Sequence, residues 1–385
     1  MTTGRPDSER GETSNVNTRT VQLVKLLTEV GPDIPEISRR LGQFKESVRY
    51  RYKEKILNKG FAVQAMVDHE RLGLQRVIAV LDFTDAYKKF SQSILASMNE
   101  LCYLVSFSRT MPGGYYVASF SAPREAVRDL KLFLSLMKEK GMFSRLDIAE
   151  FDWLRVVPMK SEFYDFDTGI WDFDWTAKNT SDFVSAQYVP STPARFDFVD
   201  LLLIKEYQMD ANKSLKEISD RLKVNYKKLA WHFSTHVAGR HLLSGYRVNW
   251  MGTRYDYAIE KALHRQHKYF AVTMLVRGVT EYETMSLRQA VDRLPFLWSE
   301  AAGKNYFCEF AFPVDFVVEG LQFLTEAISS VKERAEIYVI DQSDAAGFTI
   351  SYQKFNQARK RWEFNLPDLI ARFDALILEI KKETS

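Results

Sequence analysis

The residues that come nearest to a catalytic or metal centre in this sequence are two histidines, His232 and His236, four positions apart. On a helix this spacing places both imidazoles on one face, where they can reach the same ion. A zinc site needs further ligands, however, and neither an HExxH motif nor a CxxC pair accompanies them. The other histidines are scattered along the chain: His69, His241, His264 and His267. We therefore expect the two histidines to contact phosphate or to pack beside the wing strand described below, with no metal bound.

Other catalytic patterns are missing as well. The sequence has no GxxxxGK[ST] phosphate loop, no GxGxxG and no GxSxG motif. Cys102 and Cys308 fall in strand-like segments of different parts of the chain, so we expect two small buried side chains rather than a disulfide. The sequence thus predicts no catalytic residue, no cofactor and no metal, and a protein that is not an enzyme.

Positive charge is concentrated in two stretches of the chain. The 385 residues carry a formal net charge of +3. Residues 39–59 hold eight lysines and arginines against two glutamates, and residues 213–247 hold eight against two acidic residues. Between them, residues 162–182 hold six acidic residues against one lysine. Two separate cationic clusters are typical of surfaces that bind nucleic-acid phosphates.

The two cationic stretches belong to a unit that the chain contains twice. Glu-Ile-Ser-Arg-Arg-Leu at residues 36–41 returns as Glu-Ile-Ser-Asp-Arg-Leu at residues 217–222, 181 positions later. The same shift carries one apolar i, i+4, i+8 stripe onto another, namely Val48, Tyr52 and Ile56 onto Leu229, Phe233 and Val237. A short helix, a tight corner and a second helix with a cationic outer face are typical of a helix-turn-helix.

Each copy predicts three helices and then an alternating strand that suits a wing. We expect the first copy's helices and strand at residues 18–30, 35–41, 46–58 and 61–67, and the second copy's at residues 196–207, 214–222, 226–237 and 245–250. Each copy is followed by a segment with the order βαββαβ, which is that of a ferredoxin-like sandwich. The sheet of such a domain has one bare face, so we expect the two sheets to pack against each other.

We therefore predict an α+β protein in which two winged helix-turn-helix domains alternate with two ferredoxin-like (βαββαβ) sandwich domains. The expected divisions are a disordered tail at 1–15, a winged helix-turn-helix at 16–74, a ferredoxin-like domain at 75–160, an acidic and aromatic linker at 161–194, a second winged helix-turn-helix at 195–255, a second ferredoxin-like domain at 256–354, and a C-terminal extension with a helix at 355–385. The linker can either lie across a basic surface as a phosphate mimic or be fixed to a domain by its rings, and we favour the second.

The candidate DNA-binding residues lie opposite the apolar stripes. The first unit presents Lys45, Ser47, Arg49, Tyr50, Arg51 and Lys53, and the second presents Lys227, Lys228, Trp231 and His232. Arg49 and Tyr50 are the best candidates for base contacts, since an arginine can bridge O6 and N7 of guanine. Trp231 either stacks on a base or sugar or packs against the wing.

This chain resembles the Lrp/AsnC, or feast/famine, family of transcription regulators. The most specific passage is Asp-His-Glu-Arg-Leu-Gly-Leu at residues 68–74, which leads into a strand, and the Gly-Tyr-Tyr turn at residues 114–116 is similar to one in that family's effector-binding domain. The resemblance covers nearly the whole chain. The second half departs from it, with no Leu-Gly-Leu passage and with Lys304-Asn305 in place of Gly113-Gly114.

The resemblance implies a cytoplasmic, chromosome-associated regulator that binds double-stranded DNA, with its two DNA-contacting units held as a pseudo-dimer within one chain. It also implies a small-molecule effector such as an amino acid, for which Gly113, Gly114 and Tyr115 are the candidate residues, although an ordinary hairpin also explains this turn. Association into a homodimer is a further expectation. No apolar run reaches the roughly 18 residues that a membrane span requires, so no membrane contact is expected.

Two alternatives stay open. Sirohaem decarboxylases resemble Lrp/AsnC proteins and hold a tetrapyrrole at the interface of their sandwich domains, where histidine and arginine meet its carboxylates. The strand and turn residues considered for that role, Arg109, Tyr115 and Tyr116, include no histidine, which favours the regulator. The other alternative is an architectural chromosomal protein of weak sequence preference, for which the net charge is modest.

Overall fold

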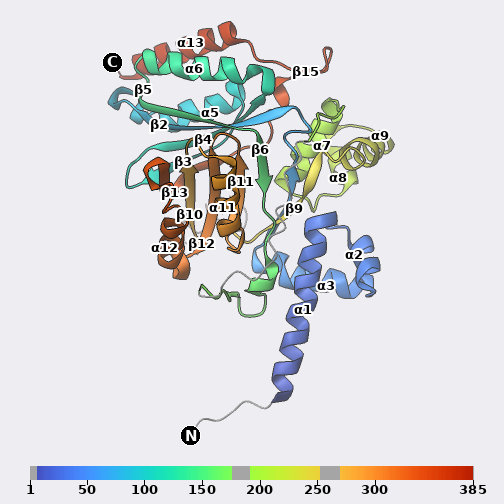
Figure 1. Ribbon diagram of the computed structural model, residues 1–385. Helices are drawn as coiled ribbons and strands as arrows, with labels where there is room; N and C mark the ends of the chain where they lie inside the picture. Colours follow the sequence, from blue (N-terminus) through green and yellow to red (C-terminus); the bar gives the residue numbers. More distant parts are fainter. Residues whose placement is uncertain (1–6, 176–190, 252–268, 385) are drawn as a thin grey trace.

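The structure is a computed structural model that describes residues 7–175, 191–251 and 269–384 (Figure 1). Two expected segments fall outside the described residues: the middle of the linker at 176–190, and residues 252–268, which include His264 and His267. The described chain combines helices with a large antiparallel sheet, so the predicted α+β class is confirmed.

The first three-helix unit consists of α1 (Asp7–Val30), α2 (Ile34–Leu41) and α3 (Lys45–Lys55), followed by β1 (Ala62–Val67). Helix α1 begins at Asp7, within the stretch expected to be a disordered tail. The side chain of Asp33 accepts a hydrogen bond from the Glu36 amide and so caps α2. The predicted stripe of α3 is buried, as expected, at Val48, Tyr52 and Ile56.

The second unit repeats this arrangement with α7 (Phe198–Met209), α8 (Leu215–Leu222), α9 (Tyr226–Trp231), a π-helical turn at His232–Ala238, and β9 (Leu243–Asn249). Ser214 and Glu217 form a capping box at the start of α8. Leu229 and Val237 are buried at the positions that the repeat predicts.

The two strands expected to form separate wings pair with each other instead. Strands β1 and β9 form an antiparallel two-stranded sheet in which Ala62 lies opposite Asn249. A lone strand leaves its backbone groups without partners, and here each unit supplies the partner of the other. At Gly245 (φ 141°) a Cβ would lie 2.7 Å from the carbonyl oxygen of Thr28, so glycine is required where β9 passes α1.

The two βαββαβ segments form the large sheet. The first consists of β2 (Leu74–Phe83), α4 (Asp85–Lys88), α5 (Ser91–Cys102), β3 (Leu104–Met111), β4 (Tyr116–Pro123), α6 (Val127–Glu139) and β5 (Phe143–Phe151). The second consists of β10 (Tyr269–Val276), α11 (Glu281–Asp292), β11 (Leu297–Ala302), β12 (Tyr306–Pro313), α12 (Val317–Ala327) and β13 (Ala335–Gly347). The strand orders are β5-β2-β4-β3 and β13-β10-β12-β11, so the two halves have the same connectivity.

Two long strands join the halves. Strand β13 pairs first with β10, up to Val339, and then with β3, up to Gly347. On the other side, β5 continues past Asp152 into β6 (Trp153–Val156), which pairs with β11. Each half therefore contributes one strand that hydrogen-bonds to both halves.

An apolar layer lies between the two halves of the sheet. Ile78, Val80 and Phe151 from the first half meet Leu275 and Phe307 from the second, with the rings of Phe151 and Phe307 6.0 Å apart. Helices cover the outer faces, and the terminal helix α13 (Leu366–Thr384) lies along α6 (Figure 1). Among the described helices, none combines the length and apolar character that a membrane span requires. Cys102 and Cys308 are free and buried, as expected.

A short aromatic hairpin follows each βαββαβ segment. The first is formed by β7 (Tyr164–Asp165) and β8 (Ile170–Trp171), and the second by β14 (Phe355–Asn356) and β15 (Arg361–Trp362). The ring of Trp171 packs on Phe296 of the other half, and the indole of Trp362 donates a hydrogen bond to the carbonyl of Leu72. The described part of the linker is thus fixed by its rings, as expected, while one of its carboxylates, Asp167, also pairs with Lys55 of α3.

The apolar layer between the sheets should dominate the stability of the chain. Replacing the fully buried Phe151 by alanine (Phe151→Ala) should lower the free energy of unfolding by about 3–5 kcal/mol, because the cavity left behind adds to the lost burial. Urea unfolding followed by tryptophan fluorescence measures this. The exposed Leu132 of α6 provides the control, since Leu132→Ala should change the value by less than about 0.5 kcal/mol. Equal effects of the two substitutions would contradict the assignment of this layer as core.

Candidate functional site

A cavity of about 180 Å³ lies between the two halves, next to the β1–β9 strand pair. The wall of the cavity is formed by strands from both halves: β2, β3 and β4 of the first half and β11 and β12 of the second. Strand β6, and β9 of the β1–β9 pair, complete it. Its polar residues include two arginines, a histidine and a glutamate, and its apolar residues include three aromatic rings: Arg76, Arg247, His69 and Glu309, with Trp298, Phe307 and Phe348. We define the first four residues as the charged wall.

Arg76 lies on β2, on the same side of the strand as Ile78 and Val80 of the apolar layer. An apolar side chain would be ordinary at this position. The buried Nε of Arg76 has no hydrogen-bond partner among the described residues. Burial lowers the pKa of Arg76 to about 10, and the carboxylate of Glu309 partly opposes this effect. The guanidinium thus stays charged at neutral pH while surrounded by protein.

Arg247 reaches the same cavity from β9. Its guanidinium lies 3.6 Å from the centre of the Trp298 ring, and its Nη2 donates to the carbonyl of Trp298 at 3.0 Å. The buried Nε has no hydrogen-bond partner in the described part of the chain. Burial lowers the pKa of Arg247 to about 9, again opposed by Glu309.

His69 follows β1 and closes one side of the charged wall. Its Nδ1 lies 2.6 Å from the hydroxyl oxygen of Ser121. Burial lowers the pKa of His69 to about 3, and the positive charge of Arg76 adds to the effect. The imidazole is therefore neutral at physiological pH, and a negative charge brought beside it would favour its protonation.

The charged wall carries more positive than negative charge. Two guanidinium groups face one carboxylate, that of Glu309, which accepts a hydrogen bond from the Ser299 hydroxyl. The unpartnered Nε–H groups of the two arginines are suited to a carboxylate or phosphate, which can accept charge-assisted hydrogen bonds from a guanidinium. The rings of Trp298, Phe307 and Phe348 add flat apolar surface, so the cavity suits an anionic ligand with an aromatic body.

The second half does not repeat this wall. Leu74 lies opposite Pro123 in the first half as Tyr269 lies opposite Pro313 in the second. Counted from these pairs, the position of Arg76 corresponds to Ala271. The pseudo-symmetry of the fold thus brings the two halves together, whereas the chemistry of the cavity is specific to one combination of their residues.

The structure places the predicted DNA-binding residues mostly at the surface. Lys45, Ser47, Arg49, Tyr50 and Lys53 are exposed on α3, whereas Arg51 is half-buried and donates to the side chain of Gln43. On the second unit Lys227, Lys228 and Trp231 are exposed, with Tyr50 and Trp231 at 69% and 52%.

His232 does not belong to that surface. It is only 3% exposed, and its Nδ1 lies 2.8 Å from a carboxylate oxygen of Asp200. The expectation that it faces DNA is wrong, because the π-helical turn and α7 enclose the imidazole.

The turn predicted to bind an effector lies outside the cavity wall. Gly113, Gly114 and Tyr115 connect β3 to β4, and the ring of Tyr115 lies under the guanidinium of Arg145. The amide of Gly114 donates to the carbonyl of Thr110, as in an ordinary hairpin. Neither Arg109 nor Tyr116 lines the cavity, and the Tyr116 hydroxyl donates to Asp344 at 2.7 Å.

No protein-family model matches the chain, and no curated protein matches it in sequence. Among solved structures, it is similar to the siroheme decarboxylase NirDL, with a TM-score of 0.53 and 12% identity over 92% of this chain and 99% of that one. It is also similar to NirDL in co-complex with an iron-uroporphyrin III analogue, with a TM-score of 0.51 and 12% identity over 91% of this chain and 98% of that one. These similarities show a shared fold along nearly the whole of both chains.

The comparisons contradict the expectation that this protein is not an enzyme. The solved structures whose fold it shares are those of an enzyme, and that fold is compatible with the Lrp/AsnC resemblance without establishing a transcription regulator. The residues first considered for a tetrapyrrole site, Arg109, Tyr115 and Tyr116, do not line the cavity, whereas His69, Arg76 and Arg247 do.

The lowered pKa of His69 should make the folded state sensitive to acid. Because the folded-state pKa lies below the usual value of the side chain, the neutral His69 contributes fully to the free energy of unfolding above about pH 6.5. This contribution is lost as the pH falls toward 3, at about 1.4 kcal/mol per pH unit. The variant His69→Asn has no such group to protonate. Between pH 7 and pH 5 the free energy of unfolding should therefore fall by about 2 kcal/mol more for wild type than for this variant. Urea unfolding at several pH values measures the difference. The exposed His241 supplies the control: His241→Asn should follow the wild-type profile, and parallel curves for all three proteins would contradict the buried, neutral imidazole.

Proposed function

We propose that this protein is an enzyme that decarboxylates a carboxylate-bearing tetrapyrrole of the siroheme type in the cavity between its two halves. The observation that carries the proposal is the charged wall, in which His69 adjoins two arginines whose Nε groups are buried without partners. The fold shared with the siroheme decarboxylase NirDL supports the same choice of substrate class.

The finer architecture fits this proposal. We interpret each half as a helix-turn-helix unit followed by a ferredoxin-like domain, arranged as an Lrp/AsnC-type pseudo-dimer. In this arrangement the strand orders β5-β2-β4-β3 and β13-β10-β12-β11 turn two bare sheet faces toward each other. The cavity then lies at the domain interface, where ligand sites are frequent.

The arginines would bind and orient the substrate. In the decarboxylation an acetate side chain, R–CH2–COO⁻, takes up a proton on carbon and releases CO2, which leaves R–CH3. Arg76 and Arg247 would hold the carboxylates through charge-assisted hydrogen bonds that use the free Nε–H groups. The cavity of about 180 Å³ has room for one carboxylate-bearing edge of the macrocycle, and the rings of Trp298 and Phe307 would pack against that edge.

His69 would supply the proton. It is neutral in the free protein because burial and Arg76 disfavour its charged form. A substrate carboxylate beside it raises its proton affinity, so the imidazole can take up a proton on binding and pass it to the carbon that loses CO2. Ser121, within hydrogen-bond distance of Nδ1, would keep the ring oriented.

Substitution of the charged wall tests this proposal. With iron-uroporphyrin III as probe and Soret absorbance as readout, Arg76→Met and Arg247→Met should each raise Kd about 30-fold, which corresponds to the loss of about 2 kcal/mol. His69→Asn should still bind siroheme but release far less CO2, as measured by mass spectrometry of the tetrapyrrole product. Arg128→Met, at an exposed position of α6, is the matched control and should leave both values unchanged. Wild-type protein that neither binds the probe nor converts siroheme would overturn the proposal.

A second candidate function is DNA binding, which the exposure of Tyr50 and Trp231 beside exposed lysines favours. In that case the anion bound in the cavity would act as an effector rather than a substrate. Arg49→Ala should weaken binding to duplex DNA and reduce the salt slope by about 0.9, and Trp231→Ala should weaken it about fivefold. Fluorescence anisotropy at several salt concentrations measures both. If neither variant differs from wild type on any duplex, these helices do not contact DNA.

A further inference from the structure

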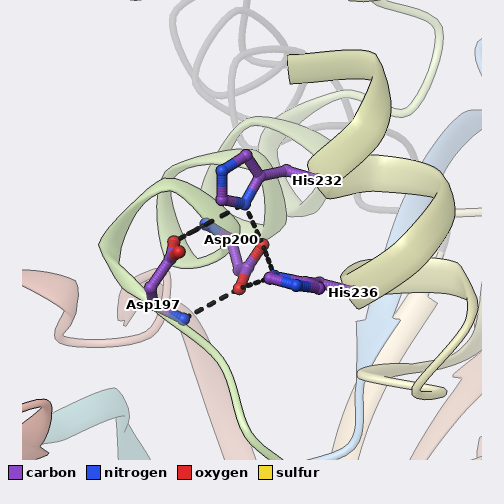
Figure 2. A group of neighbouring side chains, drawn as sticks. All are labelled: Asp197, Asp200, His232 and His236. Carbon is purple, nitrogen blue, oxygen red and sulfur yellow. Dashed lines mark hydrogen bonds and ion pairs between the residues drawn. The ribbon is translucent and has the colours of Figure 1, made fainter. Parts of the chain in front are cut away.

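A second cluster of titratable side chains lies within the second three-helix unit and shares no residue with the charged wall. Figure 2 shows His232 and His236 facing two aspartates at the start of α7. One nitrogen or oxygen atom from each of the four residues, Asp197, Asp200, His232 and His236, lies within 4.8 Å of the others. The Nδ1 atoms of both histidines point to the same carboxylate, at 2.8 Å for His232 and 2.9 Å for His236.

Three of the four side chains of the cluster are buried, and that of Asp197 is 39% exposed. The side chain of Asp200 is fully enclosed, and those of His232 and His236 are 4% and 10% exposed. Asp197 adds a second carboxylate, 3.6 Å from the Nδ1 of His232. Among the described residues, neither aspartate pairs with a lysine or arginine. The buried carboxylate of Asp200 needs a compensating charge, and a divalent cation placed among the four side chains would provide it.

Helix packing does not by itself require this cluster. The buried positions of α7 have the same spacing as those of α1: Asp200, Leu203, Ile204 and Tyr207 match Thr20, Leu23, Val24 and Leu27. Shifted by 181 positions, Arg51 and Lys55 of the first unit correspond to His232 and His236. The first unit thus forms the same three-helix arrangement with a threonine and two cations where the second has an aspartate and two histidines.

The backbone differs at the same place. Helix α3 is α-helical throughout, whereas α9 passes into a π-helical turn over His232–Ala238, which contains both histidines. Insertions of this kind occur frequently at functional sites because they redirect side chains within a helix. Asp197 and Asp200 also form the capping box of α7, which fixes both carboxylates before any ion binds.

We propose that Asp197, Asp200, His232 and His236 form a structural zinc site that fastens α9 to the start of α7. Two imidazoles and carboxylates are a donor set that zinc accepts, and four protein ligands make a closed site. Ligand atoms of a tetrahedral zinc lie roughly 3.3 Å apart. Three of the present separations are 2.8, 2.9 and 3.6 Å, and all four ligand atoms lie within 4.8 Å of one another, so side-chain shifts without a backbone rearrangement can close the site around an ion. The site is independent of the charged wall and of the substrate proposed for it.

The variant His236→Asn separates a metal site from a simple hydrogen-bonded cluster. The asparagine amide nitrogen takes about the place of Nδ1, so it keeps the hydrogen bond to Asp200 but offers no imidazole. After treatment of the full chain with a chelator and titration with Co²⁺ or Zn²⁺, wild type should bind one ion per chain and show the visible bands of four-coordinate Co²⁺. It should also gain thermal stability on binding. His236→Asn should bind at least about 100-fold more weakly and show no such gain.

Two further variants complete the test. His241→Asn is the control, because His241 is exposed and its φ of 52° suits asparagine, so metal binding should be unchanged. Asp197→Asn removes one ligand charge but keeps a good helix cap, so this variant should fold and bind the ion more weakly. It therefore tests the site even if His236→Asn does not fold. Wild type that binds no ion would show that the four side chains form hydrogen bonds only. Equal binding by wild type and Asp197→Asn would show that the ion is not held by these four ligands, and either result overturns the proposal.

Discussion

The face-to-face contact of the two halves of the large sheet is the constraint on which the rest of the structure depends. Each sheet has helices on its outer face, so the apolar side chains of its inner face must be covered by the other half. Strand β13 and the continuous pair β5–β6 hydrogen-bond across the contact, and each aromatic hairpin packs on the opposite half. Neither half is complete alone, and the cavity arises where the contact between the sheets meets the β1–β9 pair.

The charged wall is an interruption of that apolar contact. Ile78 and Val80 continue it along β2, whereas Arg76 places a half-buried cation with an enclosed Nε in the same row. Burying a guanidinium is unfavourable, and here Glu309 and the face of Trp298 offset only part of that free energy, since Nε groups stay unpaired. A perturbed, under-partnered group in a cavity is more typical of a binding site than of a core. An anionic ligand would complete the compensation.

Much of the fold follows from local pattern, and little of the site does. The apolar stripe of α3 and the two βαββαβ segments were predictable because periodicity and turn residues report local structure. The pairing of β1 with β9 was not, because each strand looks like the start of its own wing. His69 lies in the passage that resembles the Lrp/AsnC family, and Arg76 lies at the start of the first predicted βαββαβ domain. Arg247 alternates with apolar residues as a solvated side chain would. Their convergence depends on tertiary contacts, as does that of Asp200 with His232, 32 residues away.

The pairing of β3 with β13 has a consequence for biosynthesis. Met111 lies opposite Val339, so the partner of β3 leaves the ribosome about 230 residues later, a delay of roughly 10–45 s at usual elongation rates. During that interval the nascent first half exposes an unpaired strand edge and an uncovered apolar sheet face, the two features that promote aggregation. The chain should therefore depend on chaperones that shield its first half until synthesis is nearly complete.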